Sequence, residues 1–80
     1  MTTAEQVLKE LEKVSGTDQV RRDLDLAIFD EDVIDSFGAV ELMVALANTF
    51  GITISPAQID RKTWATPRKI IAYVEEKIGK

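Results

Sequence analysis

Apolar residues recur at helical spacing near the start of the chain, with charged residues on the opposite side. Thr2 and Glu5 have the spacing of a capping box, in which each residue satisfies a free backbone N–H at a helix start. Gly16 is a typical helix stop. These signals predict a first helix from about residue 2 to residue 15. Its apolar stripe consists of Val7, Leu8, Leu11 and Val14.

A broader apolar pattern lies between residues 36 and 50 and ends at Gly51. On a helical wheel its apolar residues cover about 200° of arc, so we expect this helix to be the central one, buried on most sides. A narrow strip around Glu41 remains for water. Phe37, Val40 and Val44 border that strip, which predicts an exposed face that is partly apolar.

Two further helix starts follow. Ser55-Pro56 with Gln58 supplies an N-cap, a first-turn proline and a capping-box partner, which predicts a short third helix. Thr66-Pro67 repeats the signal for a last helix, whose apolar stripe includes Ile70 and Val74. The intervening residues 51–55 alternate like a strand, but no second strand is available to pair with them, so we expect an extended linker.

Residues 17–35 show neither a helical period nor sustained alternation, yet they carry several apolar residues. A loop of this length is unusual in a small domain unless it is functional. We therefore expect an ordered loop, pinned to the core and containing a short helical turn. The fold class predicted for residues 1–80 is a single all-α domain: a four-helix bundle with three longer helices, one short helix and a long ordered loop between the first two helices.

Composition narrows the possible chemistry. The chain has no Cys and no His, so it offers neither a disulfide nor a Cys/His zinc site, and Ser36 has no evident base to activate it. The absence of a base or a thiol nucleophile argues against a stand-alone enzyme. The acidic loop fails the calcium-loop pattern, because counting from Asp23 places Ile28 and Ile34 where Gly and Glu are needed. We expect no metal site.

Nothing in the sequence predicts a targeting or membrane segment. The N-terminus lacks a basic region followed by an apolar run, so we expect no signal peptide. Glu41 and Asn48 interrupt the longest apolar segment, so we expect no insertion into a membrane.

Charge is distributed unevenly. Residues 23–60 contain eight acidic and no basic side chains, whereas the other 42 residues contain ten basic and six acidic ones, giving −8 and +4. An acidic centre attracts basic surfaces of partner proteins and repels nucleic acid. The alternative is a solvated acidic loop without a partner.

Ser36 stands between the acidic loop and the second predicted helix. Ser is a preferred N-cap, and Asp35 suits a helix N-terminus, so Ser36 is interpretable as a cap alone. The same position also suits a phosphate, because free backbone N–H groups and the helix dipole both favour an anion. Residues alone leave both interpretations open.

The stretch "DVIDSFGAVELMVALANTFGI" resembles the modification site of acyl carrier proteins, whose pattern is Asp-Ser-Leu/Met followed by an apolar-Glu-Leu run. The order of helices matches this family over essentially all 80 residues. The resemblance implies that Ser36 carries 4'-phosphopantetheine through a phosphodiester and that Asp35 takes part in recognition by the transferase. It also implies a partner surface, for which we select Phe37, Val40, Glu41 and Val44.

A second motif, "IDRKTWATPRKII" at residues 59–71, resembles the D-alanyl carrier proteins of teichoic acid modification. Fatty-acid carriers usually have an acidic residue at the position of Gly38, and peptidyl carriers usually have glycines before the serine. Phe37 and Ala39 depart from the D-alanyl pattern, which commonly has Met and Thr there.

Trp64 is expected to pack the small core. Arg68 and Lys69 lie in a first turn, where the dipole disfavours cations, which marks a functional position or pairing with Asp60.

The resemblance implies a carrier without catalytic activity of its own. A D-alanine ligase that uses ATP would load D-alanine as a thioester, and a membrane-bound acyltransferase would receive it for lipoteichoic acid synthesis. The implied location is the cytoplasm, at the inner face of the membrane, and we expect a monomer. The alternatives are an acyl carrier protein of fatty acid or polyketide synthesis and an acidic adaptor without a prosthetic group.

Overall fold

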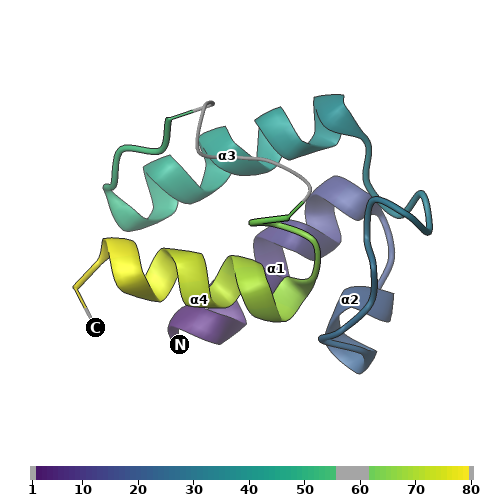
Figure 1. The fold of residues 1–80 in the computed structure, drawn as a ribbon. Coiled ribbons are helices and arrows are strands. Elements are labelled where there is room, and N and C mark those ends of the chain that lie inside the picture. The colour runs from purple at the N-terminus through teal and green to yellow at the C-terminus, as the bar shows by residue number, and fades with distance from the viewer. Residues whose placement is uncertain (1, 56–61, 80) are drawn as a thin grey trace.

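The computed structural model describes residues 2–55 and 62–79. These residues form four helices and no strand: α1 (Thr3–Ser15), α2 (Gln19–Arg22), α3 (Ser36–Phe50) and α4 (Pro67–Lys77) (Figure 1). The predicted all-α bundle with a long ordered loop is confirmed. The short helical turn expected within that loop is α2. The short helix predicted after Ser55 falls outside the described residues.

Local signals set the ends of the longer helices as predicted. The Thr2 side chain accepts a hydrogen bond from the Glu5 N–H at 3.1 Å and caps α1. At the other end Gly16 adopts a left-handed conformation, with φ of 75°, and donates its N–H to a backbone carbonyl of the last turn. Thr66 caps α4 by accepting from the Lys69 N–H at 3.2 Å. Each cap joins residues three or four apart, so sequence is sufficient to predict it.

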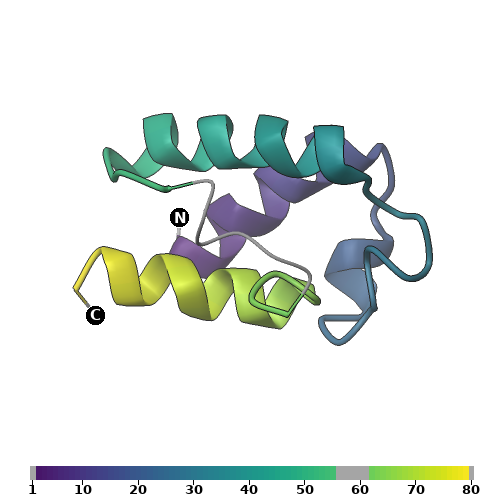
Figure 2. The same ribbon diagram turned by 45° about the horizontal axis from the view of Figure 1, so that its top comes forward.

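The central helix is α1, not α3 as the sequence suggested. α1 packs against α4, α3 and α2, whereas pairs of described helices that exclude α1 touch only slightly. Figure 2 shows α1 crossing obliquely between α3 and α4. Because α3 meets the bundle along one side, it buries only Ala39, Leu42 and Leu46. Its broad apolar arc therefore predicted too much burial.

The core lies where α1 meets α3, α4 and the loops. Trp64, just before α4, is fully buried and packs edge-to-face on Tyr73, with ring centroids 5.7 Å apart. This confirms that Trp64 packs the core. The buried hydrophobic cluster consists of Val7, Leu11, Val20, Ile28, Ile34, Leu42, Leu46, Ile54, Trp64, Ile70 and Val74.

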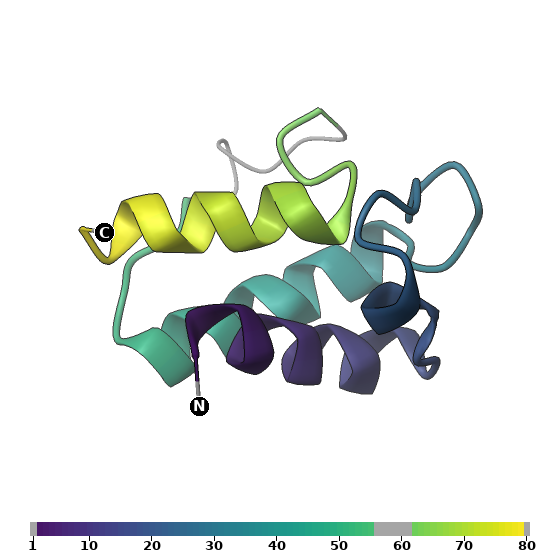
Figure 3. The ribbon, with the colours of Figure 1, turned by 90° about the horizontal axis from the view of Figure 1, so that it is seen from below.

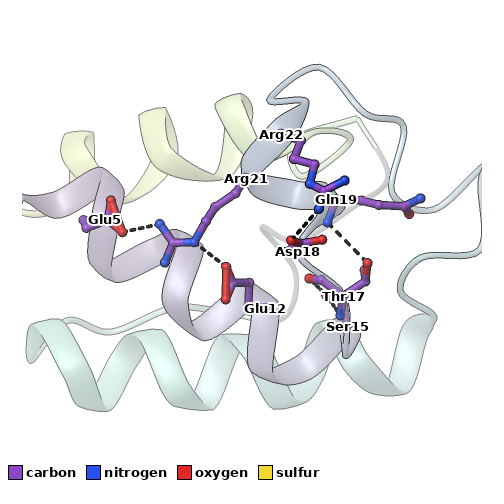
Figure 4. Close-up of polar contacts among 8 residues, drawn as sticks. All are labelled: Glu5, Glu12, Ser15, Thr17, Asp18, Gln19, Arg21 and Arg22. Carbon is purple, nitrogen blue, oxygen red and sulfur yellow. Dashed lines mark hydrogen bonds and ion pairs between the residues drawn. The ribbon is translucent and has the colours of Figure 1, made fainter.

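A cluster of ion pairs attaches α2 to α1. Arg21 donates from Nε to Glu12 and from Nη1 to Glu5, so one guanidinium joins two turns of α1 (Figure 4). The hydrogen bonds to Glu5 and Glu12 raise the pKa of Arg21 above its ordinary value. Val20 of α2 is buried in the hydrophobic core. The start of the long loop is therefore held in place.

Candidate functional site

The loop before α3 closes into a compact turn. The carbonyl of Ile28 accepts hydrogen bonds from the N–H groups of Val33, at 2.9 Å, and Ile34, at 3.1 Å. Both isoleucines are buried in the core. At the tip of the turn Asp32 adopts a left-handed backbone conformation, with φ of 55°. The prediction of an ordered loop pinned to the core is thus confirmed.

The same loop is tied to the start of α4, beside which it lies in Figure 3. The Ile28 N–H donates to the carbonyl of Ala65 at 3.1 Å, and the Arg68 N–H donates to the carbonyl of Leu24 at 2.9 Å. The Arg68 guanidinium also donates to both carboxylate oxygens of Asp25, at 2.9 and 3.4 Å. This hydrogen bonding lowers the pKa of Asp25. Arg68 thus has a partner that the sequence did not indicate, and Asp60 lies outside the described residues.

Asp35, rather than Ser36, is the N-cap of α3. Its backbone is extended, and its Oδ1 accepts a hydrogen bond from the Gly38 N–H at 2.7 Å. Interpreting Ser36 as the cap is therefore wrong. Both residue types are preferred N-caps, and the turn ending at Ile34 leaves the extended position to Asp35.

Ser36 is the first residue of α3 and is exposed. Within the described part of the chain no hydrogen bond to its hydroxyl is found. The hydroxyl therefore lies at the positive end of a helix without a structural task of its own. Such a position can accept a phosphodiester, because the helix dipole stabilises the anion and no existing contact has to be broken. The residues present fit attachment of a phosphate-linked group.

Beside Ser36 lies an open pocket of about 320 Å³ between the end of α1, the loop and the first turn of α3. Asp35 and Gly38, on either side of Ser36 in the sequence, both line it. The described lining residues are Val14, Asp32, Val33, Ile34, Asp35 and Gly38.

The exposed side of α3 is unusually apolar. Among the described residues, the large hydrophobic side chains that are exposed are Phe37, at 73%, Val40, at 53%, and Val44, at 50%. Glu41 is exposed among them. The partly apolar face predicted for this helix is thus present. Its apolar side chains lie on successive turns of α3, beginning next to Ser36. We call Phe37, Val40, Glu41 and Val44 the α3 face.

None of the helices in residues 2–55 and 62–79 has the length and apolar character needed to cross a membrane.

A family model described as a phosphopantetheine attachment site matches residues 5–74. The chain therefore belongs to the phosphopantetheine attachment-site family, whose members carry this group covalently. The match spans the loop, the capped start of α3 and the pocket described above.

Curated relatives narrow the family further. The chain is 45% identical over 73 residues, covering 91% of this chain and 92% of the relative, to the D-alanyl carrier protein of Lactococcus lactis subsp. lactis (strain IL1403). It is 42% identical over 76 residues to the D-alanyl carrier protein of Bacillus velezensis, covering 95% and 97% of the two chains. The corresponding protein of Enterococcus faecalis is 39% identical over 75 residues, covering 94% and 96%. Within its family the chain belongs with the D-alanyl carrier proteins.

Proposed function

We propose that this chain carries D-alanine as a thioester on 4'-phosphopantetheine, which is attached to Ser36. The observation that carries the proposal is the exposed Ser36 hydroxyl, free of hydrogen bonds within the described chain, at the first residue of a capped helix. When bound, the prosthetic group supplies the thiol that this cysteine-free chain lacks. The chain itself performs no catalysis.

Asp35 has two tasks in this proposal. Its side chain caps α3 through the Gly38 N–H, which holds Ser36 at the helix start. It is also the residue proposed for recognition by the phosphopantetheinyl transferase, because the carboxylate is exposed directly beside the hydroxyl to be modified. One oxygen is used by the cap, so the other is available to a partner.

The α3 face is the proposed docking surface for successive partners: the transferase, an ATP-dependent D-alanine ligase and a membrane-bound acyltransferase of lipoteichoic acid D-alanylation. Transient docking is served by a small surface with a few apolar contacts. Glu41 and the acids of the loop would steer basic residues of each partner. The proposed location is the cytoplasm, at the inner face of the membrane, with the chain acting as a monomeric single domain and without binding nucleic acid.

The first test is the intact mass of the protein purified cold, at mildly acidic pH, from its own cells. We expect a mass increase of one phosphopantetheine, with a fraction heavier by one alanyl group. The alanyl fraction depends on mild acid, which slows thioester hydrolysis. A fatty acyl chain on the arm would instead establish the alternative, a carrier of fatty acid or polyketide synthesis. An unmodified mass after incubation with coenzyme A and a competent transferase would refute the attachment.

Variants of the chain's three serines locate the site. Ser36→Ala should abolish the mass increase and leave the far-ultraviolet circular dichroism spectrum unchanged. Ser15→Ala and Ser55→Ala are matched controls and should be modified like the wild type. Modification of Ser36→Ala would place the group elsewhere.

The docking surface is tested with Val44→Asp. Because a central apolar contact in an interface often contributes more than 1 kcal/mol, this variant should raise the ligase KM about tenfold with little change in kcat. Ala72→Asp introduces the same charge at an exposed position of α4 and is the control. Equal effects of both variants would show that only net charge matters and would contradict the assignment of the α3 face.

A further inference from the structure

Two of the side chains that line the pocket beside Ser36 pack closely against Gly38. A Cβ placed on Gly38 would lie 2.8 Å from Ile34 Cγ1 and 3.3 Å from Val14 Cγ1, closer than such atoms normally approach. Any larger residue at this position would therefore displace the Ile34 and Val14 side chains, which are walls of the pocket. An open space of about 320 Å³ remains within one helical turn of the attachment serine.

The walls of the pocket combine negative charge with apolar surface. Asp32 and Asp35 are both among the lining residues, and none of the described lining residues is basic. Asp35 has one oxygen engaged by the Gly38 N–H at 2.7 Å. Within the described chain the Asp32 carboxylate has no hydrogen bond or ion pair. Val14, Val33 and Ile34 supply the apolar surface. A small group with a cationic end and a methyl group matches this lining.

We propose that the pocket receives the D-alanyl group when the prosthetic arm folds back, with the ammonium at Asp32 and Asp35 and the methyl on the aliphatic wall. This inference rests on the proposed function. The ammonium is the one cationic group of the loaded arm, whereas its phosphodiester is repelled by the two carboxylates. The tether helps, because a group on a short flexible linker has an effective concentration in about the millimolar range.

The end of the arm therefore enters the pocket only when it is loaded with D-alanine. An arm that ends in a free thiol has no cation to pair with the carboxylates, so its end stays in solvent. A D-alanyl arm bends back towards the loop. Loaded and unloaded carriers then present different surfaces near Ser36, which is a basis on which partners can distinguish them.

Methyl NMR of the intact protein tests this proposal at pH of about 6.5, where an α-amino group is protonated. Three forms are compared: the thiol form, a D-alanyl form linked through a hydrolysis-resistant amide, and a propionyl form with the same linkage. Propionyl has the size of alanyl and lacks the amino group. The probes are the methyls of Val14, Val33 and Ile34, with Val40 and Val44 on the α3 face as references.

We expect the D-alanyl form to shift the pocket methyls relative to the thiol form, and the propionyl form to leave them unchanged. Asp32→Asn removes one of the two carboxylates and should reduce the shifts by about half or more. Asn tolerates the left-handed conformation of this position, so the turn is kept. Asp30→Asn removes the same charge from an exposed position that does not line the pocket and should preserve the shifts.

Three results would overturn the proposal: unchanged pocket methyls in the D-alanyl form, equal shifts from propionyl, or equal effects of the two Asn variants. Intact mass, measured first on every sample, keeps this failure separate from failure of the proposed function. A fully loaded protein with unchanged pocket methyls refutes the pocket alone. A protein that takes up no arm at Ser36 refutes both.

Discussion

Replacing Asp35 by alanine separates the structural task of this residue from that of its neighbour Ser36. The change removes the hydrogen bond of 2.7 Å from the Gly38 N–H, together with a negative charge at the positive end of α3. Loss of such a cap costs about 1 kcal/mol, and loss of the charge–dipole interaction costs about 0.3–1 kcal/mol at low salt. Because a domain of this size loses about 4–8 °C in Tm per kcal/mol, a fall of about 5–15 °C is expected.

Two matched variants make the comparison decisive. Asp35→Asn keeps a side chain that caps as well as Asp, so it should lose only the charge term, about 0.3–1 kcal/mol. Ser36→Ala removes a hydroxyl without a partner in the described chain and should change stability by less than about 0.5 kcal/mol.

Urea unfolding followed by circular dichroism, at low and at high salt, measures all three variants on the unmodified protein. High salt should narrow the gap between wild type and Asp35→Asn, while the gap between Asn and Ala should persist. If Ser36→Ala were the most damaging variant, Ser36 would be the cap and the geometry of the site would be wrong.

Three further variants probe the surroundings of the site. Gly38→Ala should destabilise the fold by about 1 kcal/mol in urea, because the clash with Ile34, about 1–3 kcal/mol, exceeds the gain in helix propensity, about 1 kcal/mol; a more stable variant would contradict the close approach. Trp64→Ala should cost about 3–5 kcal/mol, comparable with the whole stability of such a domain, so a folded circular dichroism spectrum at 25 °C would be unexpected. Asp25→Asn should be less stable than wild type at pH 7 and low salt, because Arg68 lowers the folded-state pKa of Asp25. That stabilisation is present above pH of about 4 and is lost as pH falls through the lowered pKa, so a difference that persists at pH of about 2 would refute the ion pair.

The ends of the helices could be predicted because a cap is a contact between near neighbours in sequence. Thr2 with Glu5 and Thr66 with Lys69 pair as expected. The attachment motif is equally local, so Ser36 could be placed at the start of a helix. The apolar side chains of the α3 face could also be recognised, since helical geometry alone puts Phe37, Val40 and Val44 on one side of the helix.

The choice of Asp35 as the cap could not be predicted. Adjacent Asp and Ser are both good caps, and the decision depends on where the preceding turn leaves an extended residue. That turn is held by the buried Ile28 and by its hydrogen bond to Ala65 at 3.1 Å. The cap of α3 is therefore selected by contacts with a segment that is distant in the sequence.

The sequence by itself determined the all-α class, the bounds of α1 and α3, the start of α4, the modification motif and the acidic centre. Each of these follows from helical periodicity, from capping over three or four residues, or from composition. Only the tertiary structure decided that α1 is central, that Arg68 pairs with Asp25 across 43 residues, and that a pocket lies beside Ser36. These features arise where distant segments pack together, and the space left between them depends on side chains that are not neighbours in the chain.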